Sequence, residues 1–196
     1  MTARYGIALG LFMLIAPVFS SNAAIVPFIL DGKAGQGLLP GNENPAVPDP
    51  GSGGLGPGGI SYDTDTNILS IDIKWGSGNG FTDLTGNVSS SHIHGMTASP
   101  PPLGFTQNAG VLYTLHTLPG FDTSATNGGF VGTVSISEGD EAGLLAGRTY
   151  INVHTIANGG GEIRGQLTAV PIPAAVYLFA TGLIGLIAAG RRKTRT

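Results

Sequence analysis

The chain has 196 residues, of which 11% are charged, and it contains 33 glycines, 13 prolines and no cysteine. A length in this range supports one domain of ordinary size, and the many glycines and prolines favour a loop-rich β protein. The lack of cysteine excludes disulfides, thiolate metal ligands and a cysteine nucleophile.

Five of the nine basic residues lie near the ends of the chain, one at Arg4 and four after residue 190. Between residues 24 and 169, four basic residues stand against all twelve acidic residues, which gives this segment a formal charge of −8. A negative surface of this kind repels phosphate backbones, so nucleic acid is not an expected partner.

Residues 1–23 have the pattern of a secretory signal peptide. Arg4 precedes a short apolar run over 6–18, and small residues follow at Ser21 and Ala23. The run is shorter than a membrane span requires, which favours cleavage after Ala23 over an uncleaved anchor. The sequence therefore predicts export.

Residues 170–196 have the pattern of a sorting and anchoring segment. A proline motif precedes an apolar run over 174–190, and the basic cluster Arg191, Arg192 and Lys193 follows at once. A helix over this run would rise about 26 Å, enough to cross a thin bilayer. The positive-inside rule keeps the basic cluster in the cytoplasm and places the preceding domain outside, as the leader requires.

This tail resembles the PEP-CTERM class of sorting signals, in its Val-Pro-x-Pro-Ala variant, at Val170, Pro171, Pro173 and Ala174. The resemblance implies a Gram-negative bacterium and an exosortase-type membrane protease as the processing partner. It also implies an inner-membrane anchor before processing, and a final place in the cell envelope or outside the cell. A plain C-terminal membrane anchor is the alternative.

The segment 24–169 is expected to form a single β domain of short strands and turns. Residues 67–75 alternate most clearly, with Leu69, Ile71, Ile73 and Trp75 on one face of the strand. Further strands are expected over 25–30, 59–62, 86–94, 110–116, 129–137, 149–156 and 162–170.

A short helix is expected over 138–146, while the segment 39–59, rich in glycine and proline, is interpreted as a long surface loop or a mobile strap. The pattern predicts an all-β fold, an antiparallel Greek-key-like sandwich or barrel of about 7–8 strands with one short helix.

Three motifs of this domain resemble the CHRD domain, a family first described in chordin and common in exported bacterial proteins. They are His92-Ile-His-Gly95, Leu144-Leu-Ala-Gly147, and the closing pair Tyr150-Ile-Asn-Val-His-Thr155 and Gly160-Gly-Glu-Ile-Arg-Gly-Gln-Leu167. Asn44-Pro-Ala-Val47 is a weaker match to an early Glu-x-Pro segment. The resemblance spans residues 37–167 and implies a β fold in an extracellular setting, without an established molecular activity.

The histidines carry the most suggestive chemistry. His92 and His94 share one face of a predicted strand, and His154 shares a face with Asn152, opposite Val153. If the two strands are neighbours, the three imidazoles converge and could bind Cu²⁺, Zn²⁺ or Ni²⁺, with copper or zinc as the cofactor. The alternative is that these histidines hydrogen-bond strand neighbours and shape the sheet.

The closing hairpin carries a second polar group, in which Glu162 and Arg164 share a face. A two-residue turn would place His154 opposite Ile163, so we predict a bulge over 159–161 that brings His154 beside Glu162 or Arg164. Arg164 could form an exposed ion pair with Glu162 or with an acid of the adjacent strand, worth about 0–1 kcal/mol. Asn152, Glu162 and Arg164 are interpreted mainly as a structural polar face.

Two functions of different classes follow. In the first, the domain is a non-enzymatic binding or structural module of the cell envelope or extracellular matrix, with polysaccharide or surface proteins as partners. In the second, it is a metal-binding protein or a redox enzyme, which resembles copper/zinc superoxide dismutase in its paired histidines, its later histidine and its β fold. The sequence contains no nucleophile–base–acid arrangement and no phosphate-binding glycine loop.

Overall fold

The computed structural model describes residues 24–122 and 126–170. The expected leader with its cleavage site at Ala23, and the sorting segment from Pro171 with its apolar run and basic cluster, lie outside these residues. Within the described part, no helix has the length and hydropathy to cross a membrane.

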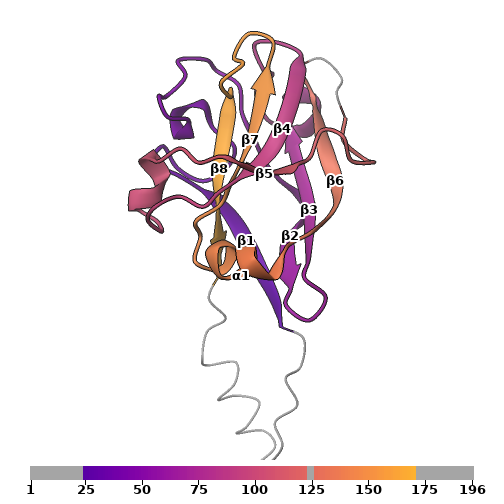
Figure 1. Ribbon diagram of the computed structural model, residues 1–196. Helices are drawn as coiled ribbons and strands as arrows, with labels where there is room; N and C mark the ends of the chain where they lie inside the picture. Colours follow the sequence, from indigo (N-terminus) through magenta and orange to yellow (C-terminus); the bar gives the residue numbers. More distant parts are fainter. Residues whose placement is uncertain (1–23, 123–125, 171–196) are drawn as a thin grey trace, which may run out of the picture.

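Eight antiparallel strands form one sheet that curls into a nearly closed barrel (Figure 1). Their order across the sheet is β5-β4-β7-β8-β1-β2-β3-β6. The strands are β1 (Ile25–Asp31), β2 (Gly53–Asp63), β3 (Ile68–Trp75), β4 (Val88–His94), β5 (Val111–Thr114), β6 (Gly128–Ser135), β7 (Tyr150–Thr155) and β8 (Ile163–Ala169). The predicted all-β fold class is confirmed, in the form of a barrel.

The inner face of the sheet forms the hydrophobic core. In β3, Leu69, Ile73 and Trp75 have no exposed surface and Ile71 is 2% exposed, as the alternation predicts. Strands from both halves of the sheet contribute further apolar side chains, and burying each one contributes about 1.5–3 kcal/mol to stability. The polar positions of the same strands therefore point away from the core.

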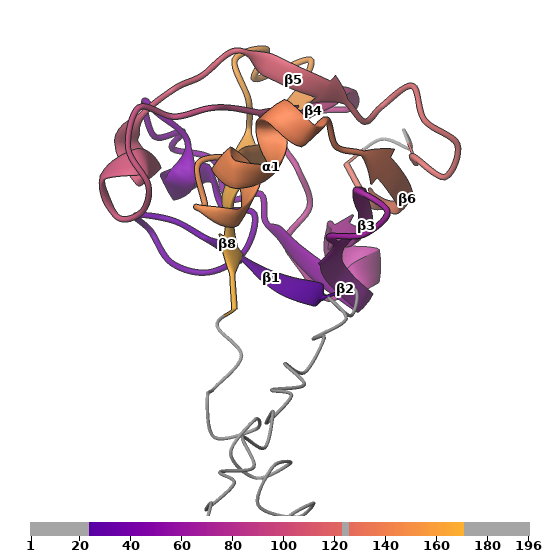
Figure 2. The ribbon, with the colours of Figure 1, turned by 60° about the horizontal axis from the view of Figure 1, so that its bottom comes forward.

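The helix α1 (Glu138–Leu145) follows β6 and lies across one end of the barrel, where Figure 2 brings it forward. Its first turn is acidic, which suits the positive end of the helix dipole, and Leu144 is buried in the core. The helix is followed by Gly147, whose φ of 72° is the left-handed conformation typical of helix ends. The predicted short helix is confirmed.

The loops of the described residues contain three short 3₁₀ helices. They are η1 (Pro40–Asn42), η2 (Ser77–Asn79) and η3 (Leu103–Thr106).

The interpretation of residues 39–59 as a surface loop is wrong in two respects. First, β2 begins at Gly53, and Gly53–Leu55 pair with β3 ahead of a register shift between Leu55 and Ile60. The glycines hide this strand because they leave few side chains to alternate. Second, the start of this segment is packed on the sheet, where Asn42 is 2% and Glu43 is 5% exposed, whereas Pro45, Ala46, Pro48 and Pro50 are exposed as a surface loop predicts.

Two loops cover the outer face of β7 and β8. One is the segment 39–52, in which Leu39 forms a bridge with Arg164. The other contains η3, and its carbonyl groups accept hydrogen bonds from the same arginine. Every residue of β7 is consequently buried. The polar face of these strands is therefore enclosed between the sheet and its covering loops, and the candidate site lies there.

Candidate metal centre

The sheet brings together the three histidines that the sequence singled out. Strands β4 and β7 are neighbours, and their register places Ile93 opposite Ile151 and His92 opposite Asn152. Ile93 and Ile151 are buried in the core, so the neighbouring polar side chains occupy the outer face. The expected convergence of His92, His94 and His154 is confirmed.

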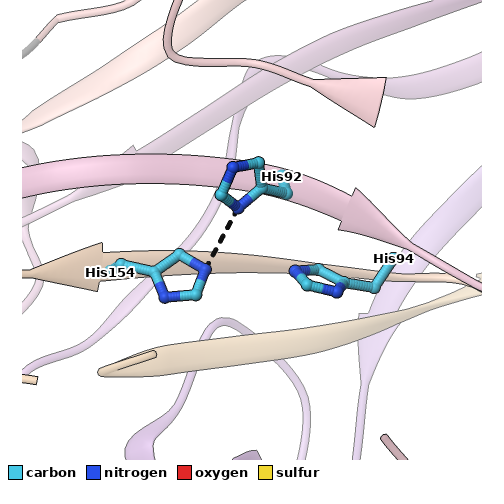
Figure 3. A group of neighbouring side chains, drawn as sticks. All are labelled: His92, His94 and His154. Atoms are coloured by element: carbon cyan, nitrogen blue, oxygen red, sulfur yellow. Dashed lines mark hydrogen bonds between the residues drawn. The ribbon is translucent and has the colours of Figure 1, made fainter. Parts of the chain in front are cut away.

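The three imidazoles form a compact group of nitrogen donors (Figure 3). One ring nitrogen from each histidine lies within 4.8 Å of the others, and Nδ1 of His92 is 3.1 Å from Nε2 of His154. Metal–imidazole bonds are roughly 2.0–2.1 Å long, so small ring movements would place all three nitrogens around one ion.

Backbone carbonyls fix the orientation of two of the three rings. Nδ1 of His94 is 2.9 Å from the carbonyl oxygen of Ala109, and Nδ1 of His154 is 3.0 Å from that of Gly159. Since a carbonyl only accepts, each Nδ1 carries the proton and each Nε2 keeps its lone pair. Nε2 of His94 is buried without a hydrogen-bond partner. This arrangement is the usual one for metal-binding histidines.

The surroundings keep all three imidazoles neutral. Burial, together with the charges of His154, His94 and His116, lowers the pKa of His92 to about 4. Burial also lowers the pKa values of His94 and His154, which are each 9% exposed. The lone pairs are therefore available for a metal at neutral and mildly acidic pH.

The fourth histidine, His116, lies beside the group without belonging to it. Its ring centroid is 5.2 Å from that of His92, but its Nδ1 is 3.2 Å from the backbone nitrogen of Ser91, which donates to it. The candidate centre therefore has three histidine donors.

The His94 imidazole stacks on the ring of Tyr150, which in turn contacts the guanidinium of Arg164. The ring of Tyr150 lies parallel to the imidazole, with centroids 4.9 Å apart and an interplanar angle of 3°. The guanidinium carbon of Arg164 lies 3.4 Å from the centroid of the same tyrosine ring. The tyrosine is thus held between a cation and a candidate metal ligand.

The expectation of an exposed ion pair for Arg164 is wrong. Its side chain is 1% exposed, and its guanidinium donates to neutral acceptors of the covering loop and of Gln166. The acceptors in the covering loop are Oδ1 of Asn108 and the carbonyl oxygens of Gly104 and Gln107. The sequence did not predict this burial because the covering loop is distant in the chain.

The closing hairpin has the predicted one-residue shift. Ile163 lies opposite Val153, and Arg164 lies opposite Asn152, so apolar residues share the inner face. Glu162 is fully buried and accepts from both the amide and the hydroxyl of Thr85, from the hydroxyl of Thr155 and from the side chain of Asn158. Glu162 therefore ties the hairpin to a neighbouring loop instead of pairing with Arg164.

Sequence reasoning missed Glu43, which opens the Glu-Asn-Pro segment of the first covering loop. Burial raises its pKa to about 7, although the positive charge of Arg164 acts in the opposite direction. Its Oε1 is buried without a hydrogen-bond partner. Glu43 and its neighbours line a surface cavity of about 420 Å³ together with Asn108, Asn158 and Gly161. The Glu-x-Pro resemblance was the only sequence signal for this residue.

Comparison with known proteins identifies one domain family. Residues 37–167 match the family described as the CHRD domain, which is the span that the motifs indicated. No curated protein and no solved structure matches the chain. The match covers the barrel from the first covering loop to β8, including all three converging histidines, and the chain belongs to the CHRD domain family.

Proposed function

We propose that this CHRD domain is an extracellular binding module whose ligand is a transition-metal ion, held by His92, His94 and His154. The observation that carries the proposal is the convergence of three neutral imidazole nitrogens within 4.8 Å. The carbonyls of Ala109 and Gly159 support it, because they leave the inward nitrogens of His94 and His154 unprotonated.

The donor set suits copper and zinc, which imidazole binds well. His94 and His154 would bind through Nε2 and His92 through Nδ1, after the proton of His92 moves to its outer nitrogen. Asn152, Glu162 and Arg164 would act as structural residues that hold the hairpin and the covering loops around the centre. The domain would bind the metal ion without catalysing a reaction. The alternative is a redox enzyme that resembles superoxide dismutase.

We also infer that the protein is exported and sorted in a Gram-negative cell envelope. The leader pattern, the tail resemblance and CHRD membership, which suggests a secreted or extracellular setting, support this inference. We expect mature protein to begin at Ala24. We expect an exosortase-type protease to process the tail near Pro171, and the mature domain to contact polysaccharide or surface proteins. N-terminal sequencing and the intact mass of protein from the cell envelope test both cleavages.

Metal content tests the proposed function. The full-length chain, purified in a mild detergent, would be analysed by elemental mass spectrometry before and after exposure to Cu²⁺ or Zn²⁺. We expect close to one equivalent in the native protein and loss of this metal in a His92→Ala/His94→Ala variant. His116→Ala is the matched control and should retain the metal. A folded native protein that binds neither ion would refute the proposal, whereas superoxide dismutation by the copper form would favour the redox alternative.

A further inference from the structure

We propose that the three-histidine centre binds monovalent copper in preference to Cu²⁺ and Zn²⁺. We further propose that the positive charge of Arg164, which contacts the Tyr150 ring on which His94 stacks, sets this preference. This inference rests on the proposed metal-binding function and names the ion.

The donor set supplies three neutral ligands and no negative charge. In the part of the chain that the structure describes, His92, His94 and His154 form the group, and no aspartate or glutamate belongs to it. Cu⁺ is stable with three nitrogen ligands, whereas Zn²⁺ normally takes a fourth ligand in a tetrahedral site. Neutral donors also leave the full charge of a divalent ion uncompensated.

Burial penalises a divalent ion more than a monovalent one. His94 and His154 are each 9% exposed, and the loops that hold their outer nitrogens close over the same face of the sheet. Since the solvation free energy of an ion grows with the square of its charge, taking a divalent ion out of water costs about four times as much. This difference favours Cu⁺ at a site where two of the three ligands are nearly buried and the third, His92, is partly buried.

A fixed positive charge, the guanidinium of Arg164, lies close to the centre. Arg164 acts on the ring of His94, and it contacts the Tyr150 ring from β8, whereas His94 stacks on the same ring from β4. One aromatic ring therefore separates a guanidinium from a ligand of the metal. A fixed positive charge at this range raises the energy of a divalent ion more than that of a monovalent one.

The charge of Arg164 is only weakly compensated. Among the described residues its hydrogen bonds go to neutral oxygens, namely three in the η3 loop and one on Gln166. Glu43 acts on it through space, but burial raises the pKa of that carboxyl to about 7, so it is only partly ionised at neutral pH. Glu162 is occupied by its bonds to Thr85, Thr155 and Asn158.

Competition between chelators and the full-length chain tests the inference. Cu⁺ would be presented under ascorbate without oxygen with bicinchoninate as competitor, and Cu²⁺ and Zn²⁺ would be presented with chelators of their own. We expect the native chain to bind Cu⁺ at least about tenfold more tightly than either divalent ion. Equal or tighter binding of Cu²⁺ or Zn²⁺ would overturn the inference and leave the proposed function standing. Failure to bind any of the three ions would overturn the proposed function as well.

Two variants test the part assigned to Arg164, with near-ultraviolet circular dichroism as the check of folding. Arg164→Gln removes the charge, and we expect it to reduce the preference for Cu⁺ over Zn²⁺ by about tenfold. Arg164→Lys keeps the charge while losing the planar fork, and should retain most of the preference. Equal preferences in both variants would assign the effect to packing and refute the role of the charge. If Arg164→Gln does not fold, the comparison of Arg164→Lys with the native chain decides, because an altered preference there contradicts a charge effect.

Discussion

The hydroxyl of Tyr150 and Nδ1 of His94 share one hydrogen-bond acceptor, the carbonyl oxygen of Ala109. The two contacts are 3.3 Å and 2.9 Å long, and the amide of Ala109 donates back to the same hydroxyl at 3.1 Å. Tyr150 thus supports His94 twice, by stacking on its ring and by holding the carbonyl that orients it. A metal ligand with two such supports loses little freedom when an ion binds.

Tyr150→Phe should separate these two supports. The phenylalanine keeps the stacking surface but loses the bonds to Ala109, so we expect metal affinity to fall by about tenfold. We expect the metal-free protein to lose about 1 kcal/mol of unfolding free energy. Isothermal titration and urea denaturation measure the two effects. Tyr113→Phe is the matched control, because the hydroxyl of Tyr113 bonds Ser137 and Asp140 and has no contact with the centre. An equal loss of affinity in both variants would contradict the assigned role.

The inner face of the sheet could be predicted from the sequence because it depends on local alternation. The alternation of β3 and β7 predicted which side chains enter the core, and the apolar positions of β8 predicted the shift that sets Ile163 opposite Val153. The convergence of the histidines followed once β4 and β7 were taken as neighbours.

The outer face could not be predicted in the same way. The burial of Arg164 and Glu43 depends on loops that fold back over β7 and β8 from distant parts of the chain. Glycine-rich segments give no alternation from which such packing can be recognised, which also explains why the start of β2 at Gly53 was missed. The sequence therefore indicated the ligands, whereas their support by Tyr150, Arg164 and Ala109 required the structure.

Gly161 should be intolerant of any side chain. Its φ is 121°, and a Cβ there would collide with Oε1 of Glu43 and lie 2.9 Å from Nδ2 of Asn152. We expect Gly161→Ala to cost about 2–4 kcal/mol of unfolding free energy, through backbone strain and displacement of the covering loop. Gly159→Ala is the control, since nothing lies within 4 Å of a Cβ at that position. Urea denaturation compares the two, and similar losses would contradict this reading of the loop.

Glu43 should make the stability of the metal-free protein depend on pH. Burial raises its pKa from 4.5 to about 7, so the folded state binds this proton more tightly than the unfolded state does. The resulting stability is fully present below pH 4.5 and is lost as the pH rises to 7, by an amount on the order of 3 kcal/mol. The Glu43→Gln variant has no carboxyl group to titrate at this position. The native chain should therefore lose stability relative to the variant as the pH rises from 4.5 to 7, so the unfolding free energy of the variant minus that of the native chain should increase. Urea titrations at several pH values measure the difference, and a constant difference would show that Glu43 titrates normally.

The lowered pKa values of the three histidines should make metal retention resistant to acid. Protons compete with a metal only when the ligands titrate, and burial together with the neighbouring imidazoles lowers the pKa of His92 to about 4. An exposed histidine pair with ordinary pKa values near 6.5 would lose affinity steadily below that pH. We therefore expect the affinity of the full-length chain for Zn²⁺ to change by less than about threefold between pH 7.5 and 5.5, and to fall as the pH approaches 4. A His-x-His peptide measured in the same buffers provides the reference. A parallel decline in protein and peptide would mean that the three rings are solvated in solution, and that the two loops do not hold them as the structure describes.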